Sequence, residues 1–117
     1  MHGPTYMGNP IACAAANASI DLFESQPRLE QVRSIEQQME QHLMPLAAHD
    51  HVDQVRCLGA VGAVRMKAEV DVAAATRFFV QRGVWVRPIR DTIYLAPAFT
   101  IQSDELSQLC EAVTDFV

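Results

Sequence analysis

Lysine is almost absent from this chain, which has one lysine, Lys67, among 117 residues. Nine lysines and arginines stand against fourteen aspartates and glutamates, so the net charge is −5 and argues against a nucleic-acid partner. The apolar runs are far shorter than a membrane span, and the N-terminus lacks the charged-then-apolar pattern of a signal sequence. These absences predict a cytoplasmic protein that binds neither nucleic acid nor membrane.

Metal-ligating and disulfide-forming residues are also scarce. Cys13, Cys57 and Cys110 form no CxxC pair, and each falls on an apolar face. We therefore expect buried free thiols in a reducing compartment rather than disulfides. His49 and His51 flank an aspartate, but nothing supplies a third ligand, so a solvated loop is expected there and no metal site.

What is present is ordinary for a globular domain. Half of the residues are apolar and a fifth are charged, and the length suffices for one domain. Hydrophobic periodicity predicts two successive helices, a strand bent or split at its glycines, a helix, two strands and a last helix. This order predicts an α/β fold, a two-layer α/β sandwich with a small, mostly antiparallel sheet. The expected ranges are helices 10–24, 27–47, 72–82 and from about 103, and strands within 52–66, 84–87 and 92–96.

Several residues mark the ends and the buried faces of these elements. Asp71 is a candidate cap for the third helix and Gly83 its C-terminal stop, and Pro45 should kink or end the second helix. The last helix should bury Leu106, Leu109, Cys110, Val113 and Phe116. The second helix should bury a stripe at helical spacing, made of Leu29, Val32, Ile35, Met39, Leu43 and Leu46.

The most informative stretch is the N-terminal string His2-Gly3-Pro4-Thr5-Tyr6-Met7-Gly8-Asn9-Pro10. It is a polar, glycine-bearing loop that enters a helix, with Asn9 as N-cap and Pro10 at the first helical position. Backbone N–H groups and the Thr5 hydroxyl beside a helix start suit a phosphate, whereas a plain capping loop is the simpler alternative. Because the chain begins inside this motif, we expect it to be a piece of a larger protein.

This string resembles the H-G-x-T-Y/F-x-G-N-P segment of class III, fold-type I aminotransferases, which use pyridoxal phosphate. The alanine-rich continuation to Ser19 resembles one member of that family in particular. In the family this loop crosses a dimer interface and holds the phosphate of the neighbouring subunit's cofactor. The resemblance thus implies that Pro4 and Thr5 bind the cofactor, that Gly3 lies beside the substrate, and that residues 1–9 reach the neighbouring subunit of a homodimer.

A second string, Gly83-Val84-Trp85-Val86-Arg87-Pro88, matches the family's GVW-x-RP. The resemblance implies that Arg87 binds a substrate carboxylate, a role that suits a planar guanidinium, whereas position alone favours an edge residue that faces water. Tyr94 matches a family tyrosine near the substrate, and packing is its alternative. After Leu95 the family usually reads Met-Pro-Pro. Here the sequence is Ala96-Pro97-Ala98, which would either widen the pocket or repack it.

The resemblance also says what this chain lacks. Transamination with pyridoxal phosphate needs a lysine that bonds to the cofactor, and Lys67 lies at the frayed end of an expected strand, where it should be solvated. In the family the catalytic lysine precedes the N-terminal loop, so we expect no catalytic residue in this chain and no activity from it alone. The implied division is a cofactor-phosphate loop of the large domain at 1–9, a connecting helix at 10–26 and the C-terminal small domain at 27–117.

The sequence thus favours the C-terminal part of a transaminase that acts on small-molecule substrates. Another class III enzyme, such as an ω-amino acid aminotransferase or an aminomutase, would share the N-terminal loop. A non-enzymatic α/β module that binds a small ligand or mediates dimerisation is the other alternative, and the missing lysine supports it. A severed small domain should expose the apolar side of the helix at 10–25 and self-associate.

Overall fold

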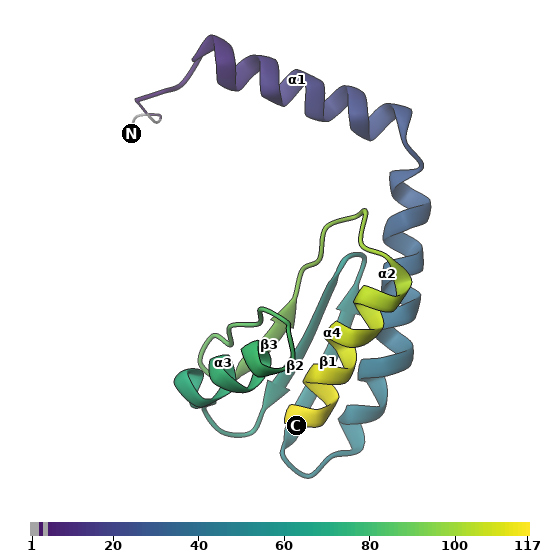
Figure 1. Ribbon diagram of the computed structural model, residues 1–117, viewed down its shortest axis with the longest axis vertical. Coiled ribbons are helices and arrows are strands. Elements are labelled where there is room, and N and C mark those ends of the chain that lie inside the picture. Colours follow the sequence, from purple (N-terminus) through teal and green to yellow (C-terminus); the bar gives the residue numbers. More distant parts are fainter. Residues whose placement is uncertain (1–2, 4) are drawn as a thin grey trace.

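A computed structural model describes residue 3 and residues 5–117 (Figure 1). Pro4, one of the two residues expected at the cofactor, lies outside the described residues. In chain order the elements are α1 (Pro10–Ser25), α2 (Arg28–Leu43), the 3-10 helix η1 (Met44–Ala48), β1 (Val52–Leu58), β2 (Val61–Met66), α3 (Val72–Gln81), β3 (Thr92–Leu95) and α4 (Ser103–Phe116).

The three strands form one antiparallel sheet in the order β1-β2-β3. Val64 at the centre of β2 pairs with Val55 of β1 on one side and with Ile93 of β3 on the other. Helices α2 and α4 lie side by side against the sheet, so the molecule has a helical and a sheet layer (Figure 1). The predicted α/β fold with a small antiparallel sheet is confirmed.

The core lies between these two layers. Met39 and Leu43 of α2, Phe79 of α3 and Cys110 of α4 are fully shielded from solvent. Full burial of such a hydrophobic side chain contributes about 1.5–3 kcal/mol. Helix α2 lies so close to β2 that a Cβ at Gly62 would come within 2.9 Å of Leu43 Cδ1. Glycine at this position therefore permits the close approach of helix and strand.

The sequence predicts that the strand over 52–66 is either bent or split at its glycines. The structure shows the split form, an antiparallel hairpin. Leu58 pairs with Val61, and Gly59 takes a positive φ of 55° in the turn between them. That conformation is easy for glycine and strained for residues with a Cβ. The Glu36 carboxylate of α2 accepts a hydrogen bond of 2.9 Å from the Gly59 N–H, which joins the turn to the helical layer.

Three predictions from the sequence are wrong. Residues 84–87 are extended but form no ladder with the sheet, so the predicted strand is absent from the described fold. Leu29 is exposed rather than buried, because the first turn of α2 extends beyond the sheet. Cys13 is exposed on α1, whereas Cys57 is half-buried and Cys110 is buried; all three are free thiols.

Helix α1 stands apart from the rest of the fold. The Asn9 side chain caps it, accepting hydrogen bonds from the N–H groups of Ile11 and Ala12, as predicted. Every residue from Pro10 to Ser25 is exposed, and the helix extends away from the two layers (Figure 1). Within the described residues, no helix has both the length and the apolar character needed to cross a membrane.

Candidate functional site

The candidate site begins where α3 ends. The Val84 N–H donates to the Phe79 carbonyl and the Gly83 N–H to the Val80 carbonyl, both at 3.0 Å, with Gly83 at a φ of 73°. This is the double hydrogen bond of a Schellman cap, which glycine permits by its positive φ. The predicted C-terminal stop at Gly83 is confirmed, and it turns the chain sharply into the extended segment that follows.

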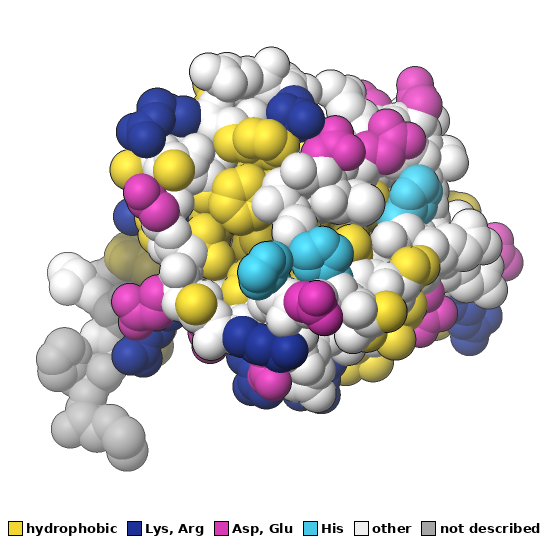
Figure 2. Space-filling view, turned by 90° about the horizontal axis from the view of Figure 1, so that it is seen from below, with side chains coloured by type: hydrophobic (Ala, Val, Ile, Leu, Met, Phe, Trp, Pro, Cys, Tyr) yellow, Lys and Arg dark blue, Asp and Glu magenta, His cyan; other side chains and the backbone are white. Residues whose placement is uncertain are grey.

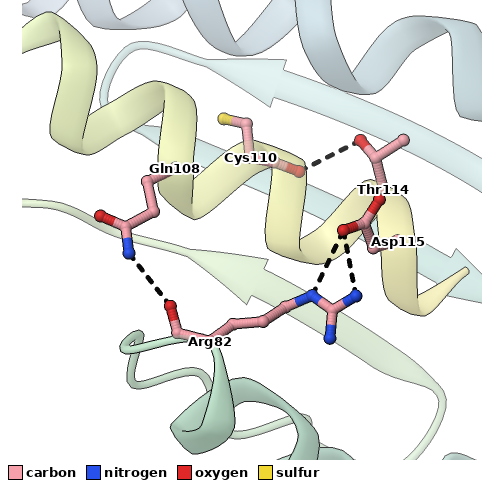
Figure 3. A network of polar contacts seen from close by, with 5 residues as sticks. All are labelled: Arg82, Gln108, Cys110, Thr114 and Asp115. Carbon is pink, nitrogen blue, oxygen red and sulfur yellow. Dashed lines mark hydrogen bonds and ion pairs between the residues drawn. The ribbon is translucent and has the colours of Figure 1, made fainter.

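The end of α3 is also fastened to α4 (Figure 3). The Arg82 guanidinium donates two hydrogen bonds to Asp115 Oδ2, at 3.1 and 3.2 Å, and lies 3.9 Å from the centroid of the Phe78 ring. The Gln108 amide donates to the Arg82 carbonyl at 3.0 Å. These contacts fix the start of the extended segment relative to α4, so that its side chains are held in place.

The extended segment 84–88 presents alternate faces, as any extended chain does. Val84 and Val86 face the core, and Val86 is 3% exposed. Trp85 and Arg87 lie on the opposite side, and Trp85 is 73% exposed. So large an apolar side chain is rarely this exposed. The face that carries Trp85 therefore offers apolar surface to which a ligand can bind.

A tight turn then returns the chain. Ile89 and Thr92 exchange hydrogen bonds of 2.9 and 3.0 Å in an isolated antiparallel bridge. The carbonyls of Arg90 and Asp91 accept hydrogen bonds from the N–H groups of Val70 and Met66. The turn is therefore anchored to the end of β2 and to the loop that follows it, although Arg90 itself has a positive φ of 57°.

Strand β3 presents the other side of the site. Ile93 and Leu95 are buried, whereas Tyr94 and Ala96 are exposed on the opposite face. Trp85, Val86 and Arg87 enclose an open cavity of about 320 Å³ together with residues 94–97 of the β3 segment and Leu109 of α4. The structure thus brings two of the predicted site residues, Arg87 and Tyr94, to one cavity.

The chemistry of this cavity suits a carboxylate that carries an apolar group. Arg87 forms no ion pair with any described residue; the ion pairs present there join Arg65 to Asp53 and Arg82 to Asp115. Its guanidinium is therefore available for a bidentate contact with a carboxylate. The Tyr94 hydroxyl adds a hydrogen-bonding group, while Trp85 and Leu109 supply apolar surface.

Trp85 and Leu109 were not predicted as site residues. A signal for Trp85 was available, because it lies two residues before Arg87 and the period of an extended chain puts both on one face. Leu109 comes from α4, far along the sequence, and was expected only in the core. It is half-buried there and also contributes to the cavity wall.

The described residues of the N-terminal loop lie beyond the outer end of α1, far from β3 and the end of α3, which border the cavity (Figure 1). Gly3 and Thr5 are exposed, and a Cβ at Gly3 would overlap Met7 Cε. The first-turn N–H groups of α1 are already used, because Asn9 accepts from Ile11 and Ala12 through its side chain. A phosphate at this loop would therefore be held by the Thr5 hydroxyl and the turn at 5–8, and not by the helix terminus.

The residues present fit one end of pyridoxal phosphate, the cofactor that the resemblance implies. The exposed Thr5 hydroxyl is a donor of the kind that a phosphate needs, so the loop fits the phosphate end of the cofactor. Lys67, the single lysine, is exposed after β2, and its backbone N–H donates to the His51 carbonyl. The described residues therefore fit the phosphate, and among them Lys67 is too exposed to serve as an enclosed amine for covalent attachment.

Two other groups of chemically active residues lie outside the cavity. His49 and His51 are exposed, with ring centroids 5.5 Å apart, and Figure 2 shows neighbouring histidine side chains on a face with charges of both signs. The described residues contain no cluster of three or more metal-ligating side chains. Burial raises the pKa of the Cys110 thiol to about 11 and also raises the pKa of Cys57, so neither thiol is a ready nucleophile.

Comparison with known proteins places the whole chain in one family. The model of the family Aminotransferase class-III matches residues 1–117. Proteins named adenosylmethionine-8-amino-7-oxononanoate aminotransferase are 46% identical over 97% of this chain in Buchnera aphidicola (subspecies Schizaphis graminum) and 39% identical over 97% in Corynebacterium glutamicum. The matches cover 26% and 27% of those proteins, so the chain spans about a quarter of the length of these relatives.

Solved structures show the same fold. A thermostable (S)-enantioselective omega-transaminase from Thermomicrobium roseum superposes with a TM-score of 0.85 at 28% identity, covering 98% of this chain and 28% of that chain. An omega-transaminase from Pseudomonas jessenii, solved in complex with PMP, has a TM-score of 0.82 at 21% identity and covers 97% of this chain and 28% of that chain. Both likenesses extend over nearly all of the residues described above.

Proposed function

The chain belongs to the class III aminotransferase family, and we propose that it is the C-terminal part of a transaminase that uses pyridoxal phosphate. The proposed reaction converts 8-amino-7-oxononanoate to 7,8-diaminononanoate, with S-adenosylmethionine as amino donor, in the biosynthesis of biotin. Whole-chain similarity to relatives with that name supports this substrate pair. The single structural observation that carries it is the cavity where Arg87 and Tyr94 meet.

Arg87 is proposed to bind the carboxylate of the keto substrate. It is an exposed guanidinium without an ion-pair partner among the described residues, held on an extended segment that begins at a fixed helix end. Tyr94, across the cavity, orients the substrate through its hydroxyl. Two such contacts fix the position of the distant keto carbon more firmly than either contact alone.

The N-terminal loop is proposed to serve a second subunit. Thr5 and Pro4 would hold the cofactor phosphate of the neighbouring protomer, with Gly3 beside its substrate, in a cytoplasmic homodimer. The separation of this loop from the cavity of its own chain supports such sharing (Figure 1). When bound, pyridoxal phosphate supplies the group that carries an amine from donor to acceptor. We assign the loop to residues 1–9, a connecting helix to 10–26 and a small domain to 27–117.

Kinetics of the complete enzyme test these roles. Arg87→Ala should raise the KM for the keto acid about 10- to 100-fold, since a hydrogen bond to a charged group contributes about 1.5–3 kcal/mol. Thr5→Val, which removes only the hydroxyl, should instead speed the loss of cofactor on dialysis. Arg56→Ala is the matched control, because Arg56 is an exposed arginine on β1 outside the cavity. An Arg87→Ala enzyme with an unaltered KM for the keto acid would refute the carboxylate role.

A second class III activity has its own support. The likeness to the omega-transaminase from Thermomicrobium roseum, with a TM-score of 0.85, favours an enzyme that acts on other amines. The amino donor separates the two candidates: turnover with S-adenosylmethionine supports the first, and turnover only with simple amines or ω-amino acids supports the second. The non-enzymatic module has no comparable support, because the family match covers residues 1–117.

A further inference from the structure

We propose that Trp85 and Ala96 form a slot for the alkyl chain of a carboxylate substrate, and that the small side chain of Ala96 sets its width. The inference rests on the proposed carboxylate role of Arg87. It gives the rest of the same cavity a role, which is to hold the alkyl chain of the substrate. It makes Trp85 and Ala96 specificity-determining residues, because they touch the part of the substrate that carries no charge.

The placement follows from the chain on either side of the turn. The antiparallel bridge pairs Ile89 with Thr92, so the two segments enter and leave the turn side by side there. Arg87 and Tyr94 each lie two residues from the bridge, and Trp85 and Ala96 each lie four residues from it. All four line the cavity. Beyond the bridge the two described segments form no ladder, and the cavity lies between them.

This arrangement gives the cavity a polar end and an apolar end. Arg87 and Tyr94 lie next to the turn, and Trp85 and Ala96 lie farther from it along the two segments. Pro97 and Leu109 complete the apolar part of the lining. A ligand that places a carboxylate at the first pair extends past the second, so the cavity suits a straight-chain carboxylic acid with several methylene groups.

Ala96 and its neighbour Ala98 make different contributions. Ala96 lines the cavity, whereas Ala98 lies outside the lining and accepts a hydrogen bond of 3.0 Å from the Ile101 N–H through its carbonyl. A longer side chain at position 96 would enter the cavity that the Trp85 indole also lines. The same side chain at position 98 would project from an exposed residue and leave the cavity unchanged.

The test uses the complete enzyme, in which the cavity is part of the proposed substrate site. Butanoate, hexanoate and octanoate are measured as competitive inhibitors against the keto acid. Affinity should rise about fourfold for each methylene buried in the slot. Ala96→Met should abolish this dependence on chain length and weaken octanoate binding at least tenfold. Ala98→Met is the matched control and should behave as the parent chain.

Primary alcohols of the same lengths separate this inference from the carboxylate role of Arg87. If acids and alcohols bind equally and both lose affinity in Ala96→Met, the slot is supported and the carboxylate role fails. If acids bind better than alcohols but Ala96→Met retains the dependence on chain length, the slot is refuted while the carboxylate role stands. Ala96→Leu fills the same space and replaces Ala96→Met if that variant does not fold. No inhibition by any acid or alcohol refutes both.

Discussion

Cys110 is the ionisable side chain at the centre of a core that, among the described residues, buries no other polar or charged side chain. Removal from water, together with the smaller effects of the nearby Cys57 and Glu111, raises its pKa from 9.0 to about 11. A thiol with a raised pKa is protonated in the folded chain over a wider pH range than in the unfolded chain. The folded state is therefore coupled to pH through this residue.

We predict that the stabilising contribution of Cys110 is lost at alkaline pH. Below about pH 9 the thiol is protonated in both states, and its contribution is fully present. As pH rises toward 11, the unfolded chain loses this proton first, which lowers the free energy of unfolding. The difference in unfolding free energy between the parent and Cys110→Ala should narrow from pH 8 to pH 11. Denaturant titrations measure it, and a constant difference would contradict the assignment.

At the residue scale, the sequence predicted the charged part of the cavity better than its apolar part. Arg87 and Tyr94 were found because they lie in strings that resemble known ones, and the structure places both at one cavity. Their roles there stay predictions. Leu109 could not be found in this way, because its position in the wall depends on how α4 packs against the segment 84–88. Such tertiary contacts leave no mark in local sequence.

At the element scale, two helices with the same kind of cap differ in what the cap stabilises. Asp71 accepts hydrogen bonds of 2.9 and 3.0 Å from the N–H groups of Ala73 and Ala74, and Asn9 caps α1 in the same way. Helix α3 buries Ala75 and Phe79 in the core, whereas every residue of α1 is exposed. Only the Asp71 cap of α3 is therefore coupled to unfolding of the core.

We predict that Asp71→Ala lowers the free energy of global unfolding by about 1 kcal/mol, the usual contribution of such a cap. Asn9→Ala is the matched control, and it should leave the global transition unchanged while reducing helicity in α1 alone. Chemical denaturation reports the first effect, and amide hydrogen exchange resolved by residue reports the second. Equal losses of global stability in both variants would show that α1 folds together with the core.

Local signals also explain which elements the sequence predicted correctly. The helices carry caps and a clear 3.6-residue period, so their ends are found within a few residues. The stretch 84–87 has the period of a strand, because Val84 and Val86 point inward and Trp85 outward. Whether such a stretch joins a sheet depends on a partner, and beyond the bridge at Ile89 the described residues provide none.

At the scale of the whole molecule, the chain is less compact than its length allows. Its radius of gyration is 17.0 Å, whereas a compact domain of this length has about 13 Å. The excess comes from α1, which extends from the end of α2 with Ile11, Ile20, Leu22 and Phe23 exposed (Figure 1). All described hydrophobic residues that are buried lie between Ile35 and Val113, so the core needs nothing from α1.

This separation leads to a prediction about the chain with and without its first helix. The 117-residue chain should self-associate, because a helix with this much exposed apolar surface has no partner within the described fold. A shortened chain of residues 27–117 should be monomeric and unfold at the same denaturant concentration, because it retains the entire buried core. Sedimentation velocity at several concentrations measures association, and denaturant titration measures stability. If the shortened chain unfolds at a lower denaturant concentration than the 117-residue chain, α1 stabilises the core. If the shortened chain associates as strongly as the 117-residue chain, the associating surface lies on the sheet and the helices that cover it.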